Sequence, residues 1–439
     1  MSRAVAAVVL ACLVGVVACD RGAPASSAGP AGPPSSASVG HHGPVVGNAA
    51  RAPSAVVAAT AAEQADLGVR LQALIGQHSV LAADMMRARL RSDADFAQAA
   101  DAALGKNTQA MTSLVASLFG SDAASQFSTL WADHVRSLFS YARALGARDT
   151  AGQESARAAL LQGEGQLGAF FSSASQGRLP AAAAEKAVRT HVGHLLGQAD
   201  AFAAGDYATA ARQYRQAYAH GFEMGGALAG ALLPADAVKA LQTPTLRLRA
   251  AFTQLLGEHV SLVVASMRAS TGDAGDLEAL GSALNGNTVD MASAIDSLFG
   301  GQAARGFQDL WADHVDALMA YTAAATQDDD AARDRAVTTL RSFERSLGTF
   351  LSGAIESRIG ADALTRALLM HDRMLVEELD AFAARDYGRA HDLGYQAYEE
   401  MYDLAGQLSN AIGLTLASRR PKGGSQTGGG GAADEVGRR

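Results

Sequence analysis

A segment that occurs twice constrains the fold of this chain more than any other feature. The sequence FSTLWADHVRSLFSY at 127–141 returns as FQDLWADHVDALMAY at 307–321. Other matching residues lie 181 positions apart in the first part of the repeat and 180 positions apart in the rest. Because self-similarity over so long a distance marks repeated structural units, the sequence predicts two homologous domains in tandem.

A shorter repeat lies inside each copy and is marked by histidine at intervals of 55 to 57 residues. The marker residues are His78, His134 and His191 in the first copy and His259, His314 and His371 in the second. An aspartate follows five of these six histidines by fifteen residues. An aspartate at such a place is typical of a turn, because its carboxylate accepts a free amide at the start of the next helix. Each unit of about 56 residues is therefore predicted to be a helical hairpin.

The composition also favours helices over strands. Alanine and leucine dominate, aromatic residues make up 6% of the chain, and proline is scarce between Pro53 and Pro421. The predicted fold class is all-α, with two six-helix domains over residues 63–233 and 234–417. An antiparallel bundle is the first expectation for each domain, and a helical solenoid is the alternative.

The charge pattern and the motifs exclude several classes of function. The net charge of −8 is spread along the chain without a basic block, so we expect no nucleic-acid partner. The chain has no nucleophile elbow, phosphate-binding loop, dinucleotide glycine pattern or two-cysteine zinc motif. The sequence therefore predicts a protein that is not an enzyme.

The N-terminus carries features of a targeting signal. Arg3 precedes a short apolar run over residues 4–17, which ends in Val-Val-Ala followed by Cys19. This segment resembles the signal peptide and lipobox of bacterial lipoproteins. The resemblance implies cleavage after residue 18, a diacylglycerol and a further acyl chain such as palmitate on Cys19, and anchoring in the membrane on its extracytoplasmic side. Secretion without a lipid is the alternative for the same segment.

The segments at the two ends differ in composition from the helical part. Residues 19–62 are rich in glycine, alanine, proline and serine, and residues 418–439 are rich in glycine and charge, so we predict a disordered tether and a disordered tail. Cys12 would leave with the signal peptide and Cys19 would carry lipid, so the mature fold is expected to lack disulfides.

The repeated histidines lie on apolar helix faces. Around His134, the residues Phe127, Trp131 and Leu138 share one stripe at spacings of three and four. Three such histidines from three helices could converge on one copper or zinc ion in each domain. Histidines that only fill the core and form hydrogen bonds would give the same pattern, so both interpretations stand.

Two further side chains extend the candidate ligand set. His194 lies one turn after His191, and Met374 takes the same place after His371, where its soft sulfur favours copper. The candidate metal ligands are His78, His134, His191, His194, His259, His314, His371 and Met374.

The LWADHV segment, the LFG that precedes it and the later DAFAARDY resemble a group of uncharacterised secreted helical proteins of bacteria that share an LWxxH motif. Some members of this group carry a copper amine oxidase label. The resemblance implies a helical unit over about residues 63–417. The label itself disagrees with the sequence, because a copper amine oxidase makes its quinone from a tyrosine that follows asparagine, and no Asn-Tyr pair occurs.

Two functions remain as the main expectations, and an enzyme of unknown type is the third alternative. The first is a lipid-anchored, non-catalytic binding or scaffold protein of the bacterial cell envelope, whose partner is an unknown envelope protein or ligand. The second is an envelope protein that binds copper or zinc through one histidine triplet per domain.

Replacing Cys19 by serine tests the predicted membrane anchor. Serine cannot form the thioether to diacylglycerol, so the Cys19→Ser protein should move from the membrane fraction to the soluble fraction. Fractionation of cells followed by immunoblotting measures this shift. An unchanged membrane fraction would contradict lipidation at this residue.

Overall fold

The computed structural model describes residues 60–272 and 275–419, and all regular elements within these residues are α-helices. The all-α prediction is therefore confirmed. The predictions for the signal peptide, Cys19, nearly all of the tether and nearly all of the tail fall outside the described residues.

The helices form two sets of six, separated by a short helix α8 (Ala235–Leu241). The first set is α2 (Ala61–Leu90), α3 (Ala94–Phe119), α4 (Ser121–Gly146), α5 (Thr150–Ala174), α6 (Ala181–Ala203) and α7 (Tyr207–Leu232). The second set is α9 (Pro244–Thr271), α10 (Leu277–Phe299), α11 (Gly301–Thr326), α12 (Asp330–Ala354), α13 (Ala361–Ala383) and α14 (Tyr387–Ser418).

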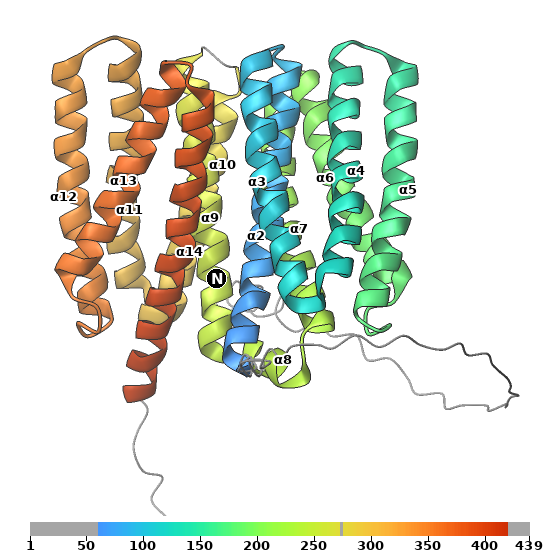
Figure 1. Ribbon diagram of the computed structural model, residues 1–439. Helices are drawn as coiled ribbons and strands as arrows, with labels where there is room; N and C mark the ends of the chain where they lie inside the picture. Colours follow the sequence, from blue (N-terminus) through green and yellow to red (C-terminus); the bar gives the residue numbers. More distant parts are fainter. Residues whose placement is uncertain (1–59, 273–274, 420–439) are drawn as a thin grey trace, which may run out of the picture. The chain divides into compact units, whose positions relative to one another are not determined.

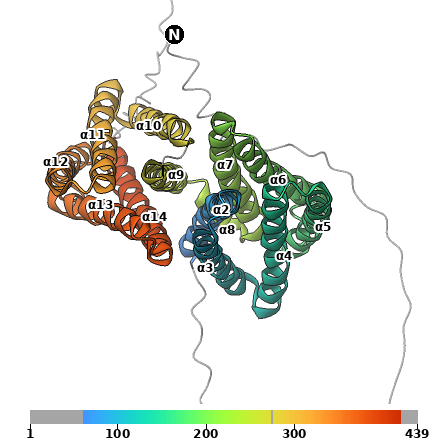
Figure 2. The same ribbon diagram turned by 90° about the horizontal axis from the view of Figure 1, so that it is seen from above.

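Each set forms a bundle of antiparallel helices (Figure 1). Consecutive helices pack against each other, and the last helix returns to the first, so that α7 lies along α2 and α14 lies along α9. Figure 2 gives the view from above. We name α2–α7 the first bundle and α9–α14 the second bundle.

The aspartates that follow the histidines begin the second helix of each hairpin. Each accepts a hydrogen bond from the amide three residues later, as predicted. These caps are Asp93, Asp149, Asp206, Asp329 and Asp386. The hairpin after His259 differs, because Asp276 lies at the start of α10 without a capping hydrogen bond from its side chain.

Paired asparagines connect the first two helices of each bundle. The amide of Asn107 donates to the carbonyl of Leu74 at 3.0 Å, and that of Asn287 donates to the carbonyl of Leu255 at 3.0 Å. Each asparagine is fully buried, and these bonds pair its NH2 group, while its side-chain oxygen has no hydrogen-bond partner among the described residues.

The two bundles contact each other through polar groups as well as apolar ones. The hydroxyl groups of Tyr218 and Tyr398 lie 3.0 Å apart. Arg215 of α7 makes a two-pronged ion pair with Glu258 of α9, at 3.0 and 2.9 Å. Arg215 is 27% exposed and Glu258 only 8%, so the pairing mainly compensates the burial of the Glu258 carboxylate at the contact between the bundles.

No helix within 60–272 and 275–419 has the combination of length and apolar character that a membrane span requires.

Glycine permits the close approach of α7 to α2, and this can be tested. A Cβ atom on Gly225 would lie 2.6 Å from the Cα atom of Gln72, so Gly225→Ala must push two helices apart. We expect a loss of about 1–3 kcal/mol in the free energy of unfolding, measured by urea denaturation.

Gly230 on the same helix is the matched control. A Cβ atom there would meet open space, so Gly230→Ala should stabilise the protein by up to about 1 kcal/mol through helix propensity. Equal effects of the two substitutions would contradict the close packing of α2 on α7.

Candidate metal centres

The histidines of each bundle come together because the hairpins repeat. His78, His134 and His191 lie on α2, α4 and α6, which are the first helices of the three hairpins. In an antiparallel bundle these alternate helices run in the same direction, so a fixed position in the repeat places the three residues at one level. The contacts among α2, α4 and α6 show that this level lies inside the bundle. The second bundle repeats the arrangement on α9, α11 and α13.

The first triplet consists of His78, His134 and His191. Its members are at most 4% exposed, and each offers a ring nitrogen that lies within 4.8 Å of those of the others. The ring centroids are 5.4 to 5.7 Å apart. Both nitrogens of His78, both of His191 and Nε2 of His134 have no hydrogen-bond partner among the described residues.

The second triplet consists of His259, His314 and His371, again buried and with one ring nitrogen each within 4.8 Å. The Nε2 atoms of His259 and His314 are 3.3 Å apart. Two imidazoles bound tetrahedrally at about 2.0–2.1 Å from one metal ion would place their nitrogens roughly 3.3 Å apart. The spacing of this pair thus fits two ligands of one metal ion, and without a metal it also fits a hydrogen bond between the two rings.

The electrostatics keep these six imidazoles uncharged at neutral pH. Burial lowers the pKa of His134 and of His371 from 6.5 to about 4. Burial, followed by repulsion from neighbouring histidines, lowers the pKa of His78, His191, His259 and His314 well below the ordinary value. A neutral imidazole is the form that binds a metal ion, so no proton has to be displaced at neutral pH.

Aromatic rings enclose both triplets. The ring of Trp131 meets that of His78 edge-on at 4.7 Å, and Trp311 meets His259 in the same way at 4.7 Å. The indole nitrogens of both tryptophans are buried and unpaired among the described residues. The repeated LW motif thus supplies the apolar surroundings of each triplet.

The second triplet has a carboxylate beside it that the first lacks at the matching place. An oxygen of Asp372 lies 3.4 Å from Nδ1 of His314, and neither atom has a hydrogen-bond partner among the described residues. Burial and the nearby Glu344 raise the pKa of Asp372 well above its ordinary value. Val192 occupies the matching position in the first bundle. The raised pKa favours the uncharged carboxyl group, which can still form a hydrogen bond to the histidine ring and orient it.

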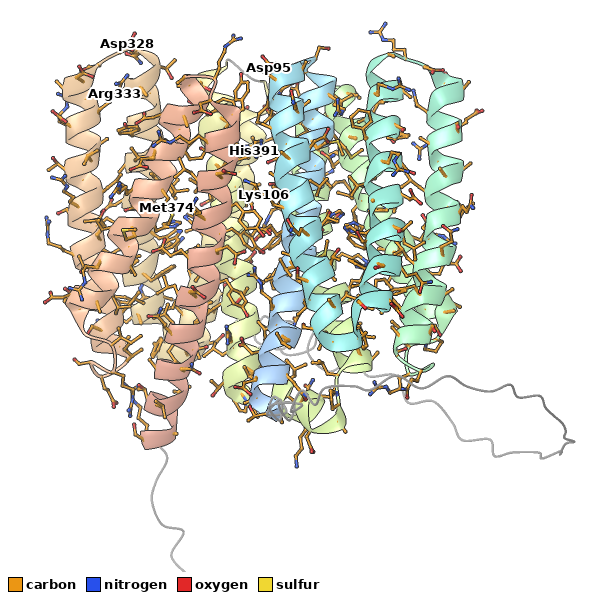
Figure 3. All side chains as sticks on the ribbon, viewed as in Figure 1. Asp95, Lys106, Asp328, Arg333, Met374 and His391 are labelled. Carbon is orange, nitrogen blue, oxygen red and sulfur yellow. The ribbon has the colours of Figure 1, made fainter. Side chains whose placement is uncertain are left out.

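The other two candidate ligands have different neighbours. Nδ1 of His194 is 2.8 Å from the side-chain oxygen of Gln213, and its ring lies 5.8 Å from that of His220. His194 is not among the groups whose ligand atoms converge. Met374 on α13, which Figure 3 labels, packs against the apolar cluster of Ala381, Ala390 and Leu393.

Asp372 was not among the site residues predicted from the sequence. The signal was nevertheless present, because an aspartate replaces valine next to a repeated histidine in one copy of the duplication only. A comparison of the two copies at each position around the histidines would have found it.

No protein family, no curated protein and no solved structure matched the chain.

The depressed pKa values predict that acid destabilises the metal-free protein. The unfolded chain binds protons at a pKa near 6.5, whereas folded His134 binds them only near 4, so stability is complete above pH 6.5 and falls as the pH decreases toward 4. We expect the melting temperature of the stripped protein to fall over this range.

A His134→Gln variant identifies the source of this loss. Without the titrating group, the variant should lose less stability than the unmodified protein between pH 6.5 and 4. The difference in the unfolding free energy that is lost should be on the order of 3 kcal/mol. Calorimetry of both proteins across this pH range measures the difference. Identical pH slopes would contradict a buried neutral His134.

Proposed function

We propose that this protein binds two transition-metal ions, one at each histidine triplet. The observation that carries the proposal is the convergence of three buried imidazoles from three helices, in each bundle, with ring nitrogens that lack hydrogen-bond partners among the described residues.

Core packing alone accounts poorly for these unpaired nitrogens. Each neutral imidazole has one N–H donor and one acceptor nitrogen, and leaving such a group buried and unpaired costs about 1–3 kcal/mol. His78, His191 and His371 each have both nitrogens unpaired among the described residues. An ion held at the centre of a triplet would satisfy one nitrogen of every ring.

The donor set favours copper(I) first and zinc second. Imidazole nitrogen suits both metals, whereas the absence of a carboxylate from either group of converging ligand atoms disfavours magnesium and calcium. Burying a single positive charge among neutral ligands costs less than burying a double charge. In the second bundle, a bound cation would favour the ionised form of Asp372, which would then offset part of that charge.

The N-terminal lipobox resemblance suggests where this metal binding takes place. A lipid on Cys19 would hold the protein at the extracytoplasmic face of the membrane. We therefore propose a non-catalytic role in buffering or delivering metal in the cell envelope. A scaffold without metal is the alternative, and it would leave the unpaired imidazoles unexplained.

Metal content tests the proposal directly. The full chain, purified without a polyhistidine tag, is loaded with copper(I) or zinc, dialysed and measured by elemental mass spectrometry. We expect two ions per chain, one for each triplet. Either His134→Gln or His314→Gln should reduce this to one ion, and the double variant should bind none.

His194→Gln is the matched control, because His194 lies one turn from His191 but outside the converging ligands. It should keep both ions. A chain that retains neither copper nor zinc after dialysis would exclude the metal proposal and favour the scaffold.

A further inference from the structure

An apolar cavity of about 60 Å³ lies in the second bundle and reaches the histidine triplet. His314 and His371 form part of its wall, together with Trp311, Phe343 and Leu351. The remaining wall consists of apolar side chains from the helices of the same bundle. The wall of the cavity is wholly apolar, so two of the three proposed ligands border it with their ring carbons.

The matching cavity in the first bundle is smaller and does not reach the histidines. It measures about 20 Å³ and is lined by apolar residues, among them Trp131, Phe170 and Phe171. Phe171 occupies the position of Leu351 in the duplication, so a larger ring fills space that leucine leaves open. One residue thus accounts for part of the difference between the two cavities.

The size and the walls of the larger cavity determine what it can hold. A water molecule needs roughly 10–15 Å³ of such volume together with two or more polar partners, whereas an apolar cavity stays dry and accepts apolar guests. A volume of about 60 Å³ accommodates an uncharged molecule of a few heavy atoms. An anion or a large substrate does not fit there.

Three imidazoles leave one coordination position of a tetrahedral metal ion unfilled. We propose that the metal ion of the second bundle, and not that of the first, takes a small uncharged molecule of diatomic size as its fourth ligand from this cavity. The inference rests on the proposed metal binding and adds an exogenous ligand to one of the two sites.

Carbon monoxide is a suitable probe, because it is small, uncharged and binds copper(I). The full chain is loaded with copper(I) without oxygen, its copper content is measured, and carbon monoxide is then titrated with infrared detection of the bound C–O stretch. We expect two copper ions but one carbon monoxide per chain. His314→Gln should abolish the signal, and His134→Gln should preserve it.

Leu351→Phe tests the part played by the cavity. It places in the second bundle the ring that Phe171 supplies in the first, so it should weaken carbon monoxide binding at least about tenfold while both copper ions remain bound. Leu414→Phe is the control. Leu414 is 60% exposed, so this substitution adds the same ring outside the cavity. It should bind carbon monoxide as the unmodified chain does.

The outcomes separate this inference from the metal proposal. Three results would overturn this inference and leave the metal proposal standing. They are two copper ions without bound carbon monoxide, two copper ions with two carbon monoxide molecules, and an unchanged affinity of Leu351→Phe for carbon monoxide. A chain that binds zinc but not copper(I) would do the same. A chain that binds neither metal overturns both proposals, and the metal measurement shows this before carbon monoxide is added.

Discussion

The cost of burying uncharged histidine rings without partners is the constraint on which the rest of this structure depends. Each bundle places three imidazoles at its centre, where water cannot reach them and where the pKa of each ring is depressed. Such an arrangement lowers stability unless something else occupies the centre. The long helices, the aspartate caps and the asparagine bonds between helices supply the rigidity that holds the rings in place.

The duplication has allowed the two centres to diverge while the scaffold stayed the same. In the first bundle Arg189 lies 2.9 Å from Glu164 and pairs its charge. In the second bundle Leu369 takes the place of that arginine, and the corresponding Glu344 lies near Asp372 instead. Glu164 therefore pairs with an arginine in the first bundle, whereas Glu344 lies near Asp372, which contacts His314, in the second. This difference gives the two histidine triplets different electrostatic surroundings.

At the contact between the bundles, residues at matching positions of the two copies have different partners. Arg87 and Arg268 occupy matching positions, yet Arg87 donates to Gln198, whereas Arg268 donates to the carboxylate of Glu378 at 2.7 Å. Arg268 also lies 3.6 Å from Asp84 of the other bundle. Glu378 belongs to the same bundle as Arg268 and already pairs its charge, so Asp84 adds a second, longer contact that links the two bundles.

The sequence alone determined the helical class, the two copies, the hairpin unit and the aspartate caps, because these follow from local periodicity and from residues close together in the chain. It also identified the six histidines, since the repeat marks them. Tertiary structure decided which side chains share a centre: it joined histidines separated by more than fifty residues and left His194 outside. It also placed Asp372 against His314 and opened a cavity beside the second triplet. Those features depend on how side chains from distant helices fill space, and no local pattern specifies that.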